Sequence, residues 1–89
     1  MCIFALIKKH YEMPTIHIID SIKILIYFDD HSPPHFHAEY NEYEELIEIK
    51  SLETYSGKLP NKQRKKVMEW ASENQAFLLE KWRTFNSKG

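Results

Sequence analysis

Two short runs in which apolar and polar residues alternate begin the part of the chain with the clearest pattern. Residues 15–19 place Ile16 and Ile18 on one face, and residues 22–28 carry three isoleucines and a phenylalanine on another. A period of two that is rich in isoleucine is typical of β-strands. Asp20-Ser21 lies between the runs and suits a tight turn, so the pattern predicts a β-hairpin.

A proline-rich break separates this hairpin from two further alternating runs. Pro33 and Pro34 restrict the backbone of the loop at residues 29–34 and make it stiff. Residues 35–40 and 43–50 then alternate, with a turn expected at Asn41-Glu42. A short extended segment around residues 53–55 could add a fifth strand.

From Pro60 the apolar residues recur at steps of three and four instead of two. This spacing is typical of an amphipathic helix, and proline suits the first helical position. We expect one long helix that ends near Phe85 and covers the sheet with Trp70, Phe77, Leu78 and Trp82. The predicted fold class is α+β: an antiparallel four- to five-stranded meander covered on one face by a C-terminal helix.

The start of the domain is predicted from where this pattern begins. Met13 is followed by Pro14, and the alternation is clear only after them. We therefore expect residues 1–12 to be an N-terminal extension and residues 13–86 to be a single domain. Either Met1 or Met13 could be the true start of the protein.

Alternation also predicts which polar side chains share a face of the sheet. If the apolar face of each strand packs against the helix, the polar face lies on the opposite side. This expectation gathers six side chains on the uncovered face: His17, Lys23, Tyr27, His35, His37 and Glu39.

Length and composition narrow the class of protein. The chain has 89 residues, of which 43% are hydrophobic and 28% charged, and its formal net charge is −1. These values are typical of one small soluble domain and give no general attraction to nucleic acid or to membranes. The single cysteine excludes an internal disulfide and a cysteine-based zinc cage. No apolar run approaches the ~20 residues of a membrane span, so we expect a cytoplasmic protein without membrane contact.

The histidine-rich segment around the prolines suggests a metal site. His35 and His37 point the same way from a strand, and His31 or Glu39 could add a further ligand. Imidazole and carboxylate groups are ligands for divalent zinc, iron or manganese. The alternative is a set of surface histidines beside a stiff turn.

The same face offers acid–base chemistry without a metal. His35 and His37, with Lys23 and Tyr27 beside them, supply a base, an acid and a cation for cleavage of a phosphodiester. A separate anion-binding candidate is the basic start of the helix, where cations oppose the helix dipole: Lys62, Arg64, Lys65 and Lys66. Its alternative is a solvated basic surface.

Several segments together resemble a small bacterial family built on a domain of unknown function. They are Met13-Pro14-Thr15-Ile16, the Tyr27-Phe28-Asp29-Asp30-His31 and Pro33-Pro34-His35-Phe36-His37 signature, residues 57–60, Glu69-Trp70 and residues 78–82. The resemblance implies a bacterial cytoplasmic βββ(β)α protein encoded beside a second small protein, in a toxin–antitoxin-like arrangement. It implies no established activity. Residues 1–12 and the Asn41-Glu42 tip, where a glycine is usual, depart from the family pattern.

Two functions follow as expectations. The first is an interaction module of a two-gene toxin–antitoxin-like system that binds the small protein encoded by the adjacent gene, and also RNA. The alternative is a metal-dependent or histidine-based nuclease or hydrolase. A second copy of the chain is the remaining candidate partner.

Overall fold

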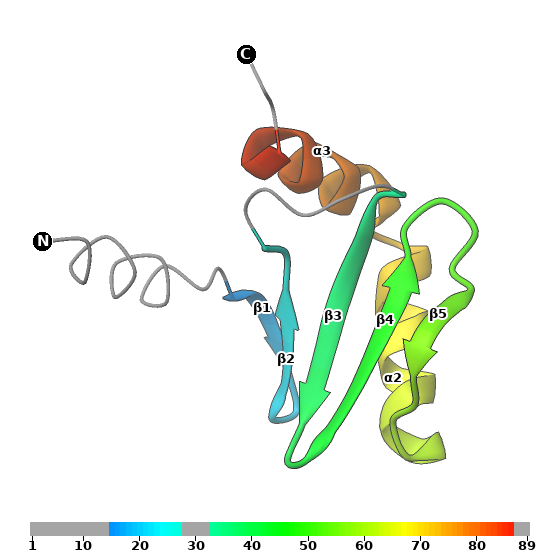
Figure 1. Cartoon of the computed structure of the whole chain (residues 1–89). Helices are drawn as coiled ribbons and strands as arrows, with labels where there is room; N and C mark the ends of the chain where they lie inside the picture. Colours follow the sequence, from blue (N-terminus) through cyan, green and yellow to red (C-terminus); the bar gives the residue numbers. More distant parts are fainter. Residues whose placement is uncertain (1–14, 28–32, 87–89) are drawn as a thin grey trace, which may run out of the picture.

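The chain forms a five-stranded sheet followed by two helices (Figure 1). The computed structural model describes residues 15–27 and 33–86. Its elements are β1 (Thr15–Ile19), β2 (Ile22–Leu25), β3 (His35–Tyr40), β4 (Tyr43–Glu48), β5 (Thr54–Gly57), α2 (Asn61–Ser72) and α3 (Gln75–Asn86). The strands lie in sequence order and every neighbouring pair is antiparallel. The predicted α+β meander is confirmed, and the fifth strand is present.

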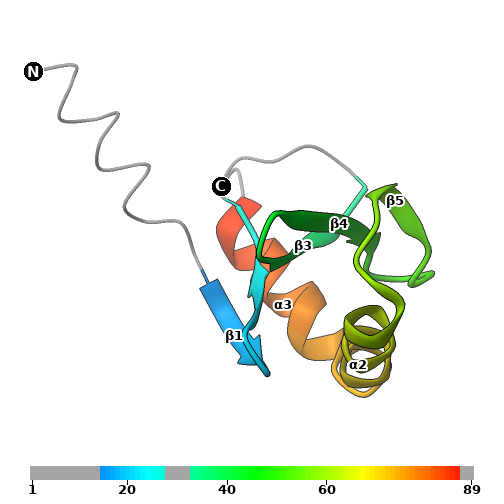
Figure 2. The ribbon, with the colours of Figure 1, turned by 90° about the horizontal axis from the view of Figure 1, so that it is seen from below.

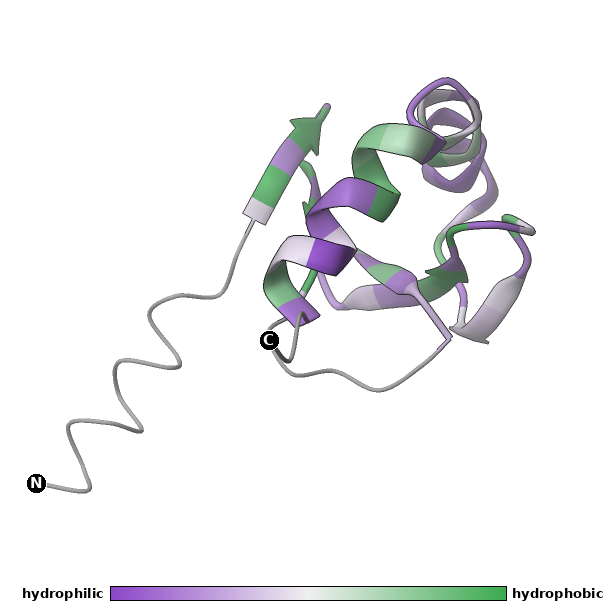
Figure 3. Cartoon of the chain, turned by 90° about the horizontal axis from the view of Figure 1, so that it is seen from above, coloured by the Kyte–Doolittle hydropathy of each residue, from purple (hydrophilic) through white to green (hydrophobic). Residues whose placement is uncertain are grey.

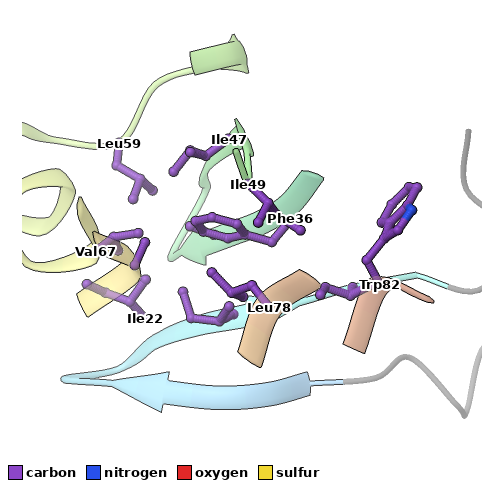
Figure 4. Close-up of a cluster of buried hydrophobic side chains, with 12 residues drawn as sticks. Ile22, Phe36, Ile47, Ile49, Leu59, Val67, Leu78 and Trp82 are labelled. Carbon is purple, nitrogen blue, oxygen red and sulfur yellow. The ribbon is translucent and has the colours of Figure 1, made fainter. Parts of the chain in front are cut away.

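The core lies between one face of the sheet and the two helices (Figures 2 and 4). The strands contribute Ile22, Ile24, Ile26, Phe36, Ala38, Ile47 and Ile49, and the segment after β5 and the helices contribute Leu59, Val67, Ala71, Leu78 and Trp82. Removing this apolar area from water is the main favourable term in folding. The predicted inward parity of β2, β3 and β4 is therefore confirmed.

The predicted single long helix is wrong, because α2 and α3 are separate helices that meet at Glu73 and Asn74. The Asn74 amide donates to the Trp70 carbonyl at 2.8 Å, and the Asn74 carbonyl accepts the Leu78 N–H. A straight helix over residues 61–86 would extend about 39 Å, whereas a six-residue strand spans about 20 Å. The break turns α3 across the end of the sheet: Figure 2 looks along α2 while α3 runs across the view.

The register of β1 corrects the expected orientation of His17. Asp20 and Ser21 have φ values of 46° and 70°, as in a type I′ turn, and Ile19 is paired with Ile22. Directly paired residues face the same side of a sheet. Ile19 and His17 therefore face the helices, and Ile18, opposite Lys23, is 57% exposed.

His17 is held on the helix side by an aromatic contact. Its ring stacks on Trp70 with 4.7 Å between centroids and 9° between planes. Figure 3 shows a hydrophilic band between hydrophobic bands along β1, the strand that follows the N-terminal trace. A bulge between Thr15 and His17 disturbs the simple alternation at the start of the strand, while Ile16 still packs against the core.

One buried carboxylate joins β4, β5 and α2 on the helix side. The Glu45 side chain is fully buried and accepts hydrogen bonds from the Leu59 N–H and from Arg64 Nε, both at 2.9 Å. The Thr54 hydroxyl also donates to it, and Arg64 reaches that hydroxyl at 3.0 Å. A buried charge requires such partners, so Arg64 has a structural role here.

Candidate functional site

The side of the sheet that faces away from α2 and α3, called here the open side, carries most of the predicted site residues. Pairing with Lys23 and with β3 identifies its members among the described strands: Ile18, Lys23, Leu25, His35, His37, Glu39, Glu44, Leu46 and Glu48. His17, expected among them, is on the other side. Leu25 and His35 are buried although they belong to this side, at 1% and 2% exposure.

His37 forms a histidine–carboxylate pair with Glu44 on the open side. Nδ1 of His37 lies 2.9 Å from Oε2 of Glu44, across the diagonal between β3 and β4. The His37 side chain is 12% exposed and that of Glu44 is 44% exposed. Donation from Nδ1–H to the carboxylate fixes the orientation of the imidazole ring. This is the arrangement that a general base requires.

Tyr27 and His35 surround this pair. The Tyr27 ring meets the His37 ring edge-on at 4.4 Å, and its hydroxyl donates to Oε2 of Glu39 at 3.4 Å. His35 donates from Nδ1 to the Pro33 carbonyl at 2.8 Å, and its ring lies 5.3 Å from that of His37. Three of the four predicted acid–base residues, Tyr27, His35 and His37, therefore lie together. Glu44, which was not predicted, contacts His37.

His35 is packed between other rings as well. The Trp82 and Tyr55 rings lie 5.2 Å and 5.4 Å from it. Trp82 comes from α3 and Tyr55 from β5, so His35 connects the start of β3 to both. This packing explains why His35 is buried rather than displayed, and it makes His37 the more accessible imidazole.

Lys23, the fourth predicted acid–base residue, lies further along the open side. It is paired with Glu39, and both side chains line a shallow polar hollow of about 280 Å³ together with Ser21 and Asn41. A hollow with one ammonium and one carboxylate can bind a polar group of either charge.

Of the four predicted metal ligands, His31, His35, His37 and Glu39, the structure describes the last three. His31 lies outside the described residues. Among residues 15–27 and 33–86 no group of three or more histidine, cysteine, aspartate or glutamate side chains is arranged to hold a metal ion. Nδ1 of both His35 and His37 is hydrogen-bonded to protein oxygen, so this nitrogen is already used in each ring.

Two of the four predicted anion-binding residues form ion pairs. Arg64 pairs with buried Glu45, and Nζ of Lys66 lies 2.6 Å from Oδ2 of Asp20. Lys66 donates to this carboxylate and holds the pKa of Asp20 below its ordinary value, with the charge of Lys62 adding to the effect. Lys62 and Lys65 are exposed at the start of α2, so the basic surface is smaller than the sequence suggested.

Sequence reasoning missed Glu44 and Glu45. Glu44 has the outward parity of Leu46 and Glu48, and the turn at residues 41–42 pairs it with Glu39. Strand parity combined with the turn would therefore have placed it beside His37. Glu45 shares the inward parity of Ile47, and this parity would have predicted a buried carboxylate that needs a cationic partner.

Comparison with known proteins identifies a family and nothing closer. No curated protein and no solved structure matches the chain. No helix in the described parts of the chain is long and apolar enough to span a membrane. The family model for the domain of unknown function DUF4160 matches residues 21–83, which include β2 to β5 and most of both helices. The chain therefore belongs to the DUF4160 family.

Proposed function

We propose that this protein is an interaction module that binds a basic segment of a protein partner on its open side. The observation that carries the proposal is the charge of that side. Glu39, Glu44 and Glu48 lie on it, and Lys23 is its one basic residue among the described strands. Complementary charge across an interface speeds association and excludes wrong partners.

Apolar groups on the same side supply contact area for such a partner. Ile18 is 57% exposed, and the partly buried Leu46 lies between His37 and the outer strand β5. Apolar groups surrounded by polar and charged ones are the usual composition of a protein interface. The three carboxylates, of which Glu44 is the exposed one, would pair with lysine or arginine side chains while the apolar groups exclude water.

The partner we propose is the small protein encoded by the adjacent gene in a toxin–antitoxin-like pair. The support is the sequence resemblance that includes the Pro33-Pro34-His35-Phe36-His37 segment. RNA is a poorer ligand for the open side because its phosphates would meet three carboxylates. RNA would instead require the exposed Lys62 and Lys65 at the start of α2.

Co-purification with the adjacent gene product tests this proposal. Both proteins are co-expressed, and the complex is compared for wild type, Glu44→Lys and Glu80→Lys. Glu80 is exposed on α3, away from the open side, and makes the same charge change. We expect Glu44→Lys to weaken binding by about 10-fold or more and Glu80→Lys to leave it unchanged. Equal binding by all three, or recovery of RNA alone, would refute the proposal.

The histidine–carboxylate pair supports a second candidate, a histidine-based nuclease or hydrolase. His37 would act as the base, oriented by Glu44 and packed against Tyr27. Removing such a base lowers the rate by about 10²–10⁴-fold. Growth on expression of wild type and His37→Ala, with RNA integrity measured in both cultures, tests it. Equal growth and intact RNA in both would eliminate this candidate.

The metal-dependent form of that enzyme is a separate proposal. It would use His31, His35, His37 and Glu39, of which His31 lies outside the described residues. Metal analysis of protein purified without a histidine tag is the direct measurement. A metal content far below one per chain would eliminate it.

A further inference from the structure

The outer strand β5 presents a free edge with a distinctive arrangement of charge. β5 pairs with β4 alone, and its four residues, Thr54–Gly57, are all exposed and uncharged. The pairing continues on both sides of it: the Glu48 N–H donates to the Glu53 carbonyl at 2.9 Å, and the Lys58 N–H donates to the Glu44 carbonyl at 3.0 Å. A six-residue edge, residues 53–58, therefore lies along the sheet.

One acidic and one basic side chain terminate this edge on the same side of the sheet. Glu53 lies beside Glu48 and Lys58 lies beside Glu44, and both neighbours belong to the open side. Paired residues share a side, so Glu53 and Lys58 share it too. Both are exposed, and neither forms an ion pair with another residue in the described ranges.

We propose that β5 pairs antiparallel with β5 of a second copy of this chain, about a two-fold axis between Tyr55 and Ser56. In this register Tyr55 lies opposite Ser56 of the other copy and Thr54 lies opposite Gly57. The next position outward places Glu53 opposite Lys58 of the other copy, twice by symmetry. A two-fold interface requires a surface that is complementary to itself, and residues 53–58 meet this requirement.

The backbone agrees with this register. In antiparallel strands the N–H and C=O groups of successive residues point alternately to one neighbour and to the other. The Glu53 carbonyl and the Lys58 N–H point to β4, and the bulge near Tyr55 adds one residue between them. Thr54 and Gly57, although three positions apart, therefore both direct their backbone groups outward. The two-fold axis brings these two residues opposite each other, where they can exchange hydrogen bonds. Exposed strand edges are templates for such pairing.

The other edge of the sheet lacks this complementarity. A two-fold pairing of β1 with itself would place His17 opposite His17 and would bring no acid opposite a base. β5 is short and has a bulge near Tyr55, two features that weaken an edge as a template. The dimer should therefore be weak and should depend on its two charge pairs, which salt screens.

A charge exchange tests the proposed register. Analytical ultracentrifugation of the full chain, from about 10 μM to about 1 mM, measures the dimer constant at low and at high salt. We expect wild type to dimerise and salt to weaken the dimer. Glu53→Lys and Lys58→Glu should each weaken it by about 10-fold or more, and the double exchange should restore it to within about threefold.

A charge reversal outside the edge serves as the control. Lys65→Glu makes the same charge change as Lys58→Glu at an exposed position of α2, outside residues 53–58, and should not alter the dimer constant. Circular dichroism establishes that each variant is folded. A wild type that is monomeric at about 1 mM, a double exchange that fails to restore the dimer, or a control that weakens it equally would overturn the proposal. Partner binding through Glu44 is measured separately and does not decide this outcome.

Discussion

Replacing Arg64 with methionine should destabilise the protein strongly, because it removes the cationic partner of a buried carboxylate. Methionine preserves most of the length and apolar character of the arginine stem. The Glu45 side chain is fully buried, and Arg64 Nε lies 2.9 Å from its Oε2. The Leu59 N–H and the Thr54 hydroxyl would stay as neutral donors.

The expected loss of stability follows from the charges of Arg64 and Glu45, the distance between them and the exposure of the Arg64 side chain. Two unit charges 2.9 Å apart attract by about 6 kcal/mol at an effective dielectric constant of about 20. The Arg64 side chain is 36% exposed, so water both screens the pair and enters the space that arginine leaves. We therefore expect a loss of about 2–3 kcal/mol, below the roughly 3–5 kcal/mol found for fully buried pairs. In a domain of this size that lowers Tm by about 10–20 °C.

Urea and thermal unfolding followed by circular dichroism measure this loss. The double variant Glu45→Met/Arg64→Met should be more stable than Arg64→Met alone, because it removes the unpaired carboxylate. Its own cost of about 1–2 kcal/mol comes from the Leu59 N–H, which loses its acceptor. The exposed control Lys65→Met should stay within about 0.5 kcal/mol of wild type. If Arg64→Met also stays within that range, or if the double variant is the less stable, the reasoning fails.

Three further predictions concern the sheet and its turns. Ile18→Thr should cost less than about 0.5 kcal/mol, whereas Ile19→Thr, on the helix side, should cost about 1–2 kcal/mol; equal losses in urea unfolding would contradict the β1 register. Gly57→Ala should destabilise by more than about 1 kcal/mol, since Gly57 has φ 76° and a Cβ would collide with the backbone oxygen of Glu44; an unchanged Tm would contradict this. Lys66 lowers the pKa of Asp20, so the Asp20–Lys66 pair stabilises the fold above the unfolded-state pKa of Asp20, and this stabilisation is lost as pH falls through the folded-state pKa. Asp20→Asn should therefore make the free energy of unfolding depend less on pH in that acid range. An unchanged pH dependence would show that the pair contributes nothing.

Strand parity predicted most of the fold because the sheet is a simple meander. Phe36 is buried while His37 lies on the open side, as alternation required. The error at His17 came from counting each strand separately. The Asp20-Ser21 turn pairs Ile19 with Ile22, and this register, rather than the local alternation of β1, decides which side His17 faces.

The helix and the site depended on tertiary contacts that periodicity does not contain. The spacing of three and four continues on both sides of residues 72–74, so the sequence allowed a kink at Ser72–Asn74 but did not predict two separate helices. The break is instead supported by the Gln75 amide, which donates to the carbonyls of Ile49 and Lys50 at 2.9 Å and 3.1 Å. Likewise, the Arg64–Glu45 pair joins residues 19 positions apart, so a basic run in the sequence could not reveal that one member was already used.

The ring contacts of the two tryptophans make the molecule suitable for site-resolved fluorescence. Each of the two indoles lies against a different imidazole, Trp70 on His17 and Trp82 near His35. Replacing one indole by phenylalanine leaves an emission signal from a single known place. Emission from Trp70 then reports on the β1–β2 hairpin, and emission from Trp82 reports on the start of β3, where a ligand on the histidines would be sensed.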